Sequence, residues 1–126
     1  MRTDYSFTRA ITGGSKTEND ASPGNQLMYI PENQANALFK IGYKNIYSSW
    51  IASFAGKRYI TVENSKYLPG YFINNLSTGI KFTFKSTSVD LNFSIDNLFN
   101  IYYQSIAYYP LPGRSYLVKI IFQIVK

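Results

Sequence analysis

The residues that could perform catalysis or bind a metal are few and scattered along the chain. The sequence contains no His and no Cys. It therefore lacks the usual general base at neutral pH, the commonest zinc ligand and any thiolate nucleophile. No two of its seven carboxylates have a spacing that suggests a catalytic pair; they are Asp4, Glu18, Asp20, Glu32, Glu63, Asp90 and Asp96. The sequence predicts that the protein is not an enzyme and needs no cofactor.

The positive charge is spread out in the same way. The formal net charge is +6, and a nucleic-acid-binding protein of this balance would gather its cations along one stripe or helix. Here Lys40, Lys81 and Lys119 each stand singly inside a strand-like segment. This spacing favours a polar, mildly basic lumen or rim over a track of phosphate contacts, and we expect no nucleic-acid partner.

The elements that position these residues are strands, because apolar and polar residues alternate with a period of two. Between residues 72 and 84 the even positions are mostly apolar and the odd ones mostly polar, and the split recurs over 88–96 and 115–125. Such alternation is typical of strands whose two faces meet different environments. Weaker alternation covers 35–43 and 49–56, and a short opening strand is expected over 5–11. The prediction is an all-β fold of about six antiparallel up-and-down strands.

The connections between these strands alternate between short and long. Tight turns fall at 44–46 and 85–87, whereas the segments 12–33, 61–71 and 97–114 are long. Short turns at one end and long loops at the other are typical of outer-membrane barrels. A soluble β-barrel or sandwich also alternates, with its apolar face turned inward. Aromatic residues near segment ends are expected in interfacial girdles; they are Tyr43, Tyr47, Trp50, Tyr59, Tyr67, Tyr71, Tyr102, Tyr103 and Tyr116.

The last third of the chain carries an ordered set of short motifs. After an alternating strand come Asn97-Leu98-Phe99, Tyr103, an aromatic loop with Tyr108 and Tyr109, the turn Pro112-Gly113-Arg114, and a final strand. This order and spacing resembles the C-terminal signature of TonB-dependent outer-membrane receptors. Upstream, Tyr29-Ile-Pro31, Gly56-Lys-Arg58-Tyr59 and Leu68-Pro69-Gly70-Tyr71 look like further landmarks of that family, so the resemblance extends over nearly the whole chain.

The resemblance implies that residues 1–126 are the C-terminal part of a transmembrane β-barrel, with the plug domain and TonB box absent. Receptors of this family take up a scarce, large nutrient such as a ferric siderophore, haem or cobalamin, with energy passed through TonB to the plug. The implied partners are the remaining strands and plug of the same receptor, TonB, the barrel assembly machinery and the lipid of a Gram-negative-type outer membrane. Six strands leave two open edges, so we expect this fragment to supply barrel wall and outer loops only.

The resemblance also suggests roles for single residues. The structural motif residues would be Asn97, Leu98, Phe99, Tyr103, Pro112, Gly113 and Arg114. For Arg114 we favour ordering of its turn or a position at the lipid headgroups over binding of an anionic ligand. Tyr102, Tyr108 and Tyr109 are possible outer-loop contacts for a planar ligand, although packing at the loops is favoured. Lys81, Asp90, Asn92 and Asp96 would face the lumen together with Asn75, Ser77 and Ser94. Asp90 and Asp96 would pair with cations such as Lys81 or Lys119, or, as we favour, remain solvated.

The opposite, apolar face would meet lipid; its members are Phe72, Leu76, Ile80, Phe82, Val89, Leu91, Phe93, Ile95, Val118, Ile120 and Phe122. Two alternatives stay open. A soluble β-barrel or sandwich that binds a small hydrophobic ligand would bury Phe82, Leu91, Phe93 and Ile120 in its interior. A surface-assembly module built by association of edge strands would form ordered oligomers in buffer.

Overall fold

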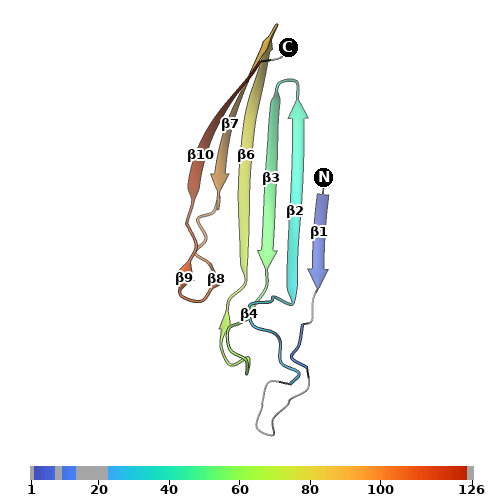
Figure 1. Ribbon diagram of the computed structural model, residues 1–126, viewed down its shortest axis with the longest axis vertical. Coiled ribbons are helices and arrows are strands. Elements are labelled where there is room, and N and C mark those ends of the chain that lie inside the picture. The colour runs from blue at the N-terminus through green and yellow to red at the C-terminus, as the bar shows by residue number, and fades with distance from the viewer. Residues whose placement is uncertain (1, 8–9, 14–22, 125–126) are drawn as a thin grey trace.

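Six long strands form one antiparallel sheet in the computed structural model, which describes residues 2–7, 10–13 and 23–124 (Figure 1). The strands are β1 (Arg2–Phe7), β2 (Asn33–Tyr43), β3 (Ile46–Ala55), β6 (Tyr71–Phe84), β7 (Thr87–Asp96) and β10 (Ser115–Ile124). They lie in the order β1-β2-β3-β6-β7-β10, so every long strand pairs with the next long strand of the chain. The predicted all-β, up-and-down fold is confirmed.

The two ends of the sheet differ in their connections (Figure 1). At the short-turn end, two-residue turns join β2 to β3 through Lys44-Asn45 and β6 to β7 through Lys85-Ser86. At the loop end, small hairpins form within the long connections: β4 (Arg58–Tyr59) pairs with β5 (Tyr67–Leu68), and β8 (Gln104–Ile106) pairs with β9 (Tyr109–Pro110). These hairpins were not predicted, because strands of two or three residues are too short to show alternation.

The opening strand begins earlier than predicted. Its described part runs from Arg2 to Phe7, whereas the prediction covered 5–11, and Ile11 forms an isolated bridge with Gln26. Phe7 lies opposite Asn33, the first residue of β2. Residues 8–9 of the predicted strand, residues 14–22 of the first loop and Val125 at the predicted end of the last strand lie outside the described residues.

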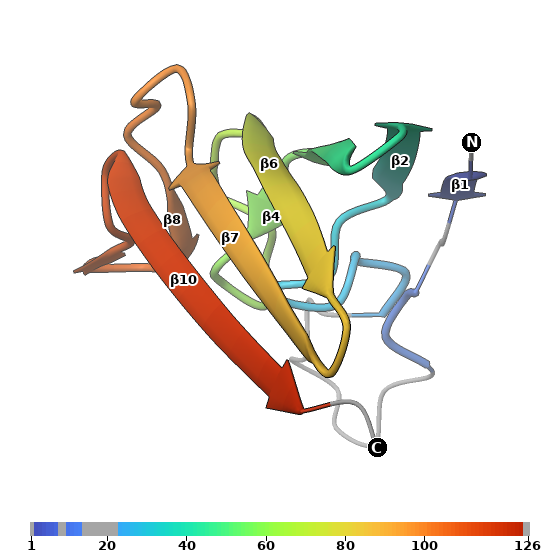
Figure 2. The ribbon, with the colours of Figure 1, turned by 90° about the horizontal axis from the view of Figure 1, so that it is seen from above.

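The sheet is one curved layer with β1 and β10 at its opposite edges (Figure 2). In the part of the chain that the structure describes, no pairing joins these two edges, so the barrel is not closed. The hairpin of β6 and β7 extends beyond the turn between β2 and β3, where the Lys81 backbone N–H donates to the Asn45 carbonyl at 2.8 Å. A stagger of this kind accompanies the strand tilt of a barrel.

Few apolar side chains are buried. Among the described residues the buried apolar set is Ala52, Leu68 and Ile73, whereas Val118, Phe122 and Ile124 are 68%, 72% and 82% exposed. A sheet in water needs a second layer to cover such a face. The described residues include no helix that is both long enough and apolar enough to cross a membrane.

Candidate functional site

Strand register sorts the side chains of the sheet onto two faces. Ile46, Ile80 and Leu91 are cross-strand partners in one row, which continues to Ile120 on β10. One residue further along β6, Lys81 pairs with Asp90, and Asn92 pairs with both Gly79 and Lys119. Because successive residues of a strand point to opposite faces, the first row belongs to an apolar face and the second set to a polar face.

A hydrogen-bonded group on the polar face, here called the Tyr47 cluster, joins three strands. The Tyr47 hydroxyl donates to Asp90 Oδ1 at 2.7 Å, and Asn92 Nδ2 donates to the Tyr47 hydroxyl at 3.3 Å. Two serines complete the cluster: Asn92 Nδ2 donates to Ser77 Oγ at 2.9 Å, and Ser94 Oγ donates to Asn92 Oδ1 at 2.9 Å. The wall therefore satisfies much of its own polar face.

Gly79 allows the Tyr47 cluster to form. Tyr47 lies on β3 and Asp90 on β7, with β6 between them. Gly79 is the β6 partner of Tyr47, and a Cβ built there would collide with the Tyr47 ring, including its Cε1 at 2.8 Å. The missing side chain lets the ring lie across β6. A glycine inside a strand is the sequence signal that could have predicted this close approach.

Two expectations for this face need correction. Tyr47 was expected in an interfacial girdle, but it lies on the polar face because it is the register partner of Gly79 and Gly42. Asp90 was expected to be solvated or paired with Lys81 or Lys119, but its contact is the Tyr47 hydroxyl. The four residues expected to face the lumen share this face, with Asp96 opposite Ser115.

A second polar group, here called the Asn97 junction, lies at the loop end. Asn97 is 3% exposed and has a positive φ of 52°. Its side chain donates to the carbonyls of Ile101 at 2.8 Å and Pro112 at 3.4 Å, and accepts the Ile101 N–H at 2.8 Å. Its own backbone N–H donates to Asn75 Oδ1 at 3.0 Å. The Asn97 side chain thus joins the segment after β7 to the turn before β10, and its backbone N–H ties both to Asn75 of β6.

The turn before β10 is held by Asn100, a residue that was not predicted to have a role. The Arg114 backbone N–H donates to Asn100 Oδ1 at 2.9 Å. A Cβ on Gly113 would lie 2.7 Å from that oxygen, so glycine is needed there for the close approach. Through the Arg114–Asn100 bond and the Asn97–Pro112 bond, the Asn97-Leu98-Phe99 and Pro112-Gly113-Arg114 motifs lie next to each other. The first motif is also tied to β6, because the Leu98 N–H donates to the Asn74 carbonyl at 2.7 Å.

A buried arginine organises the rest of the loop end. Arg58 is 3% exposed, donates from Nη2 to the Pro69 carbonyl at 2.8 Å, and lies 4.7 Å from the centre of the Tyr71 ring. The Tyr71 and Tyr103 rings are 4.6 Å apart and tilted by 52°. Burial raises the pKa of the Tyr103 phenol, and the nearby Tyr71 and Asp96 act in the same direction. Tyr71 was expected in a girdle, but it packs between a cation and a second ring.

The tyrosines expected as outer-loop contacts lie around the β8–β9 hairpin. Tyr102, Tyr108 and Tyr109 are 74%, 88% and 70% exposed. Tyr102 and Tyr103 help line a cavity of about 200 Å³ together with Leu68, Pro69 and Gln104. Among the described residues, no group of three or more His, Cys, Asp or Glu side chains could hold a metal ion. In the described part of the loop end, exposed aromatic rings are available for binding.

A single curved sheet with an exposed apolar face, a hydrogen-bonded polar face and loops at one end defines a segment of a transmembrane β-barrel wall. The family model for the TonB-dependent receptor-like β-barrel matches residues 1–98, and the chain belongs to this family of receptors, which are not enzymes. The resemblance inferred from the motifs is thereby confirmed.

The fold is similar to the crystal structure of BauA, the ferric preacinetobactin receptor from Acinetobacter baumannii. The TM-score is 0.67, with 20% sequence identity over 85% of this chain. The chain spans 17% of the length of that receptor chain. A comparison with curated proteins found no match.

Proposed function

We propose that residues 1–126 form the C-terminal part of the barrel of an outer-membrane receptor that takes up a scarce, large nutrient. The observation that carries this proposal is the single-layer sheet, whose apolar face is exposed while its polar face is internally hydrogen-bonded. Lipid cannot satisfy unpaired backbone groups. In the complete receptor, β1 and β10 would therefore pair with the remaining strands.

In this arrangement the apolar face meets lipid and the polar face lines the lumen. Lys81, Asp90, Asn92 and Asp96 would then face the plug of the same receptor. The short turns would lie in the periplasm and the loop end outside the cell, as in other outer-membrane barrels. The barrel assembly machinery would insert the chain, with Phe122 in the last strand as the aromatic residue that it reads.

The ferric siderophore class is the favoured nutrient, because the similar structure BauA is a ferric siderophore receptor; haem and cobalamin are the other members of the expected class. Energy would reach the plug through TonB. Tyr102, Tyr108 and Tyr109 would offer their rings to the ligand at the loop end, where they are the most exposed tyrosines of the region. The Asn97 junction would hold these loops in place.

The alternative of a soluble domain that binds a hydrophobic ligand lacks its required feature. It needs Phe82, Leu91, Phe93 and Ile120 inside a core, and these side chains are 37%, 38%, 40% and 54% exposed. Their shared apolar face instead has the character of a lipid-facing surface.

Cysteine accessibility tests the proposal, since the chain has no cysteine of its own. Lys119→Cys and Ile120→Cys are matched variants, because they are neighbours in β10 on opposite faces. In membranes of Gram-negative cells that express the chain, a water-soluble maleimide is expected to label Lys119→Cys and to leave Ile120→Cys unlabelled. On intact cells it should label Tyr108→Cys and reach Ser86→Cys only after permeabilisation.

Equal labelling of Lys119→Cys and Ile120→Cys in the membrane fraction would contradict a lipid-facing apolar face. Recovery of the chain as a β-rich monomer in the soluble fraction would favour the soluble alternative. Labelling of Ser86→Cys but not Tyr108→Cys on intact cells would reverse the proposed orientation.

A further inference from the structure

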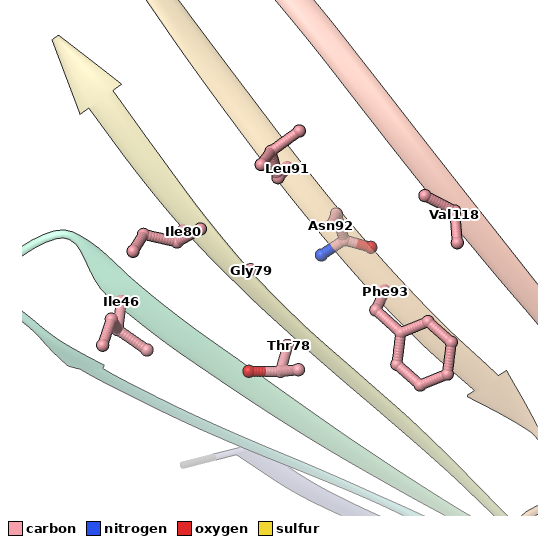
Figure 3. A pocket seen from close by; sticks show the side chains of 8 residues that line it. All are labelled: Ile46, Thr78, Gly79, Ile80, Leu91, Asn92, Phe93 and Val118. Atoms are coloured by element: carbon pink, nitrogen blue, oxygen red, sulfur yellow. The ribbon is translucent and has the colours of Figure 1, made fainter.

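The apolar face is not uniformly bulky, and a groove of about 370 Å³ crosses it (Figure 3). Two neighbouring rows of cross-strand partners line it. Ile46, Ile80 and Leu91 form the first row, and Thr78, Phe93 and Val118 belong to the second. The side chains of the second row are small on β3 and β6, where Ser48 and Thr78 are partners. The groove therefore combines small lining residues, Thr78 and Gly79, with bulky apolar side chains, and Asn92 also contributes to its lining.

The hydroxyl groups of Thr78, which lines the groove, and of its cross-strand partner Ser48 do not make the groove polar. Ser48 Oγ donates to the Ser77 carbonyl at 3.1 Å, and Thr78 Oγ1 donates to the Tyr47 carbonyl at 3.3 Å. Both hydroxyls are therefore paired with the backbone of the sheet. Because a hydroxyl without a partner is unfavourable in hydrocarbon, this arrangement suits an apolar occupant such as an acyl chain.

A cation lies at the short-turn end of the groove. Ile46 directly follows the Lys44-Asn45 turn, and Tyr43 is its cross-strand partner on the same face. Lys44 Nζ lies 5.3 Å from the centre of the Tyr43 ring, so the ammonium group is held beside the apolar face. Residues 43–46 and 84–87, which form the two short turns and their flanks, contain Lys44 and Lys85 but no carboxylate. This end of the sheet therefore complements an anion.

We infer that the groove and Lys44 together bind one anionic phospholipid, with an acyl chain along the groove and the phosphate at the Lys44 ammonium group. The inference rests on the proposed function, because it requires the apolar face to lie in a membrane. A negatively charged headgroup is preferred to a zwitterionic one because the short-turn end offers positive charge without a neighbouring carboxylate to balance it.

Trp50 gives this site a natural reporter. It is the single tryptophan of the chain and lies on the apolar face in the row next to Ser48 and Thr78, 40% exposed. The full chain is reconstituted in vesicles of unlabelled phosphatidylcholine. A rising fraction of a lipid with bromine-labelled acyl chains is then included, either brominated phosphatidylglycerol or brominated phosphatidylcholine. Bromine quenches tryptophan fluorescence on contact. The fraction of brominated lipid that gives half of the maximal quenching therefore compares how strongly the two lipids bind. The anionic lipid is expected to act at an about fivefold lower fraction, the effect of one lysine beside an anionic headgroup.

Two pairs of variants separate the parts of the site. Lys44→Gln is expected to abolish the preference, whereas Lys85→Gln, at the other short turn, should keep most of it. Thr78→Phe fills the groove and should abolish the preference with Lys44 intact, whereas Thr78→Val keeps the volume and the preference. Circular dichroism of each variant checks that the strands have formed.

The outcomes distinguish this inference from the proposed function. Equal quenching of the unchanged chain by both brominated lipids would overturn the phospholipid site and leave the membrane location standing. Quenching by neither lipid, with the strands formed, would overturn the membrane location itself. A preference that survives in Lys44→Gln, or that is lost equally in Lys85→Gln, would show a general charge effect and overturn the site.

Discussion

The two polar groups of the wall are built from different kinds of hydrogen bond. In the Tyr47 cluster, side chains bond to side chains across β3, β6 and β7, strands that the backbone ladder already joins. In the Asn97 junction, one side chain bonds to backbone groups of Ile101 and Pro112, which lie in segments outside the main sheet. The Tyr47 cluster adds side-chain bonds to strands that are already paired through their backbones. The Asn97 junction instead supplies bonds to backbone groups that have no strand partner in the main sheet.

The difference indicates which polar residues determine the structure. Where a ladder satisfies the backbone, a lost side-chain bond exposes at most one or two polar atoms on a face that water reaches. Where a side chain satisfies the backbone, its loss leaves part-buried peptide groups without that partner, which costs more than the bond itself contributes. We therefore expect substitutions in the Asn97 junction to be more destabilising than those in the Tyr47 cluster.

Asn97→Ala should have the largest effect. It removes the partners of the Ile101 N–H and C=O groups and places alanine at a positive φ of 52°. An unsatisfied buried group costs about 1–3 kcal/mol and the left-handed backbone about 1 kcal/mol for alanine. The expected loss is about 3 kcal/mol in the free energy of unfolding, measured by urea titration of the chain in detergent micelles.

Two matched variants divide that loss into its parts. Asn97→Gly accepts the positive φ and loses only the side-chain bonds, so it should be less damaging than alanine. Asn97→Asp keeps an oxygen for the Ile101 N–H and should lose least. If alanine and aspartate are equally stable, the junction does not hold the loops in the way described.

Gly79→Ala comes next, because the added Cβ collides with the Tyr47 ring. Overpacking of this kind costs about 1–3 kcal/mol, and we expect about 2 kcal/mol in the same titration. Gly42→Ala is the matched control: Gly42 is the partner of Tyr47 on the other side, and its Cβ would meet only the Ile46 carbonyl oxygen, at 3.8 Å.

The cause can be isolated by a double-mutant cycle. In a Tyr47→Ala background the ring is gone, so Gly79→Ala should lose most of its effect. Equal costs in both backgrounds would mean that the glycine serves the strand itself and not the passage of the ring.

Features that depend on consecutive residues could be predicted from the sequence, whereas features that depend on contacts between distant strands could not. Period-two alternation located five of the six long strands and separated the two faces, since it is a property of consecutive residues. The face on which Tyr47 lies was not predicted. The apolar residues Ile51 and Ala55 lie on the same face of β3 as Tyr47, so apolar and polar residues do not alternate clearly in this strand. The bond from Tyr47 to Asp90 depends on the register across β3, β6 and β7, which no local pattern specifies. Asn75 and Asn100 were missed as motif partners for the same reason.

Tyr47→Phe should have the smallest effect of the three. It removes only the hydroxyl that donates to Asp90 at 2.7 Å and leaves the ring over Gly79. A net hydrogen bond contributes about 1 kcal/mol, and water can replace the lost donor because both residues are only half-buried. The loss in the urea titration should therefore be at most about 1 kcal/mol. Adding Asp90→Asn to this variant should cost little more, since the partner is already gone. If Tyr47→Phe destabilised the chain as strongly as Asn97→Ala, backbone pairing would not protect the sheet from the loss of a side-chain bond, and the proposed difference between the two groups would be wrong.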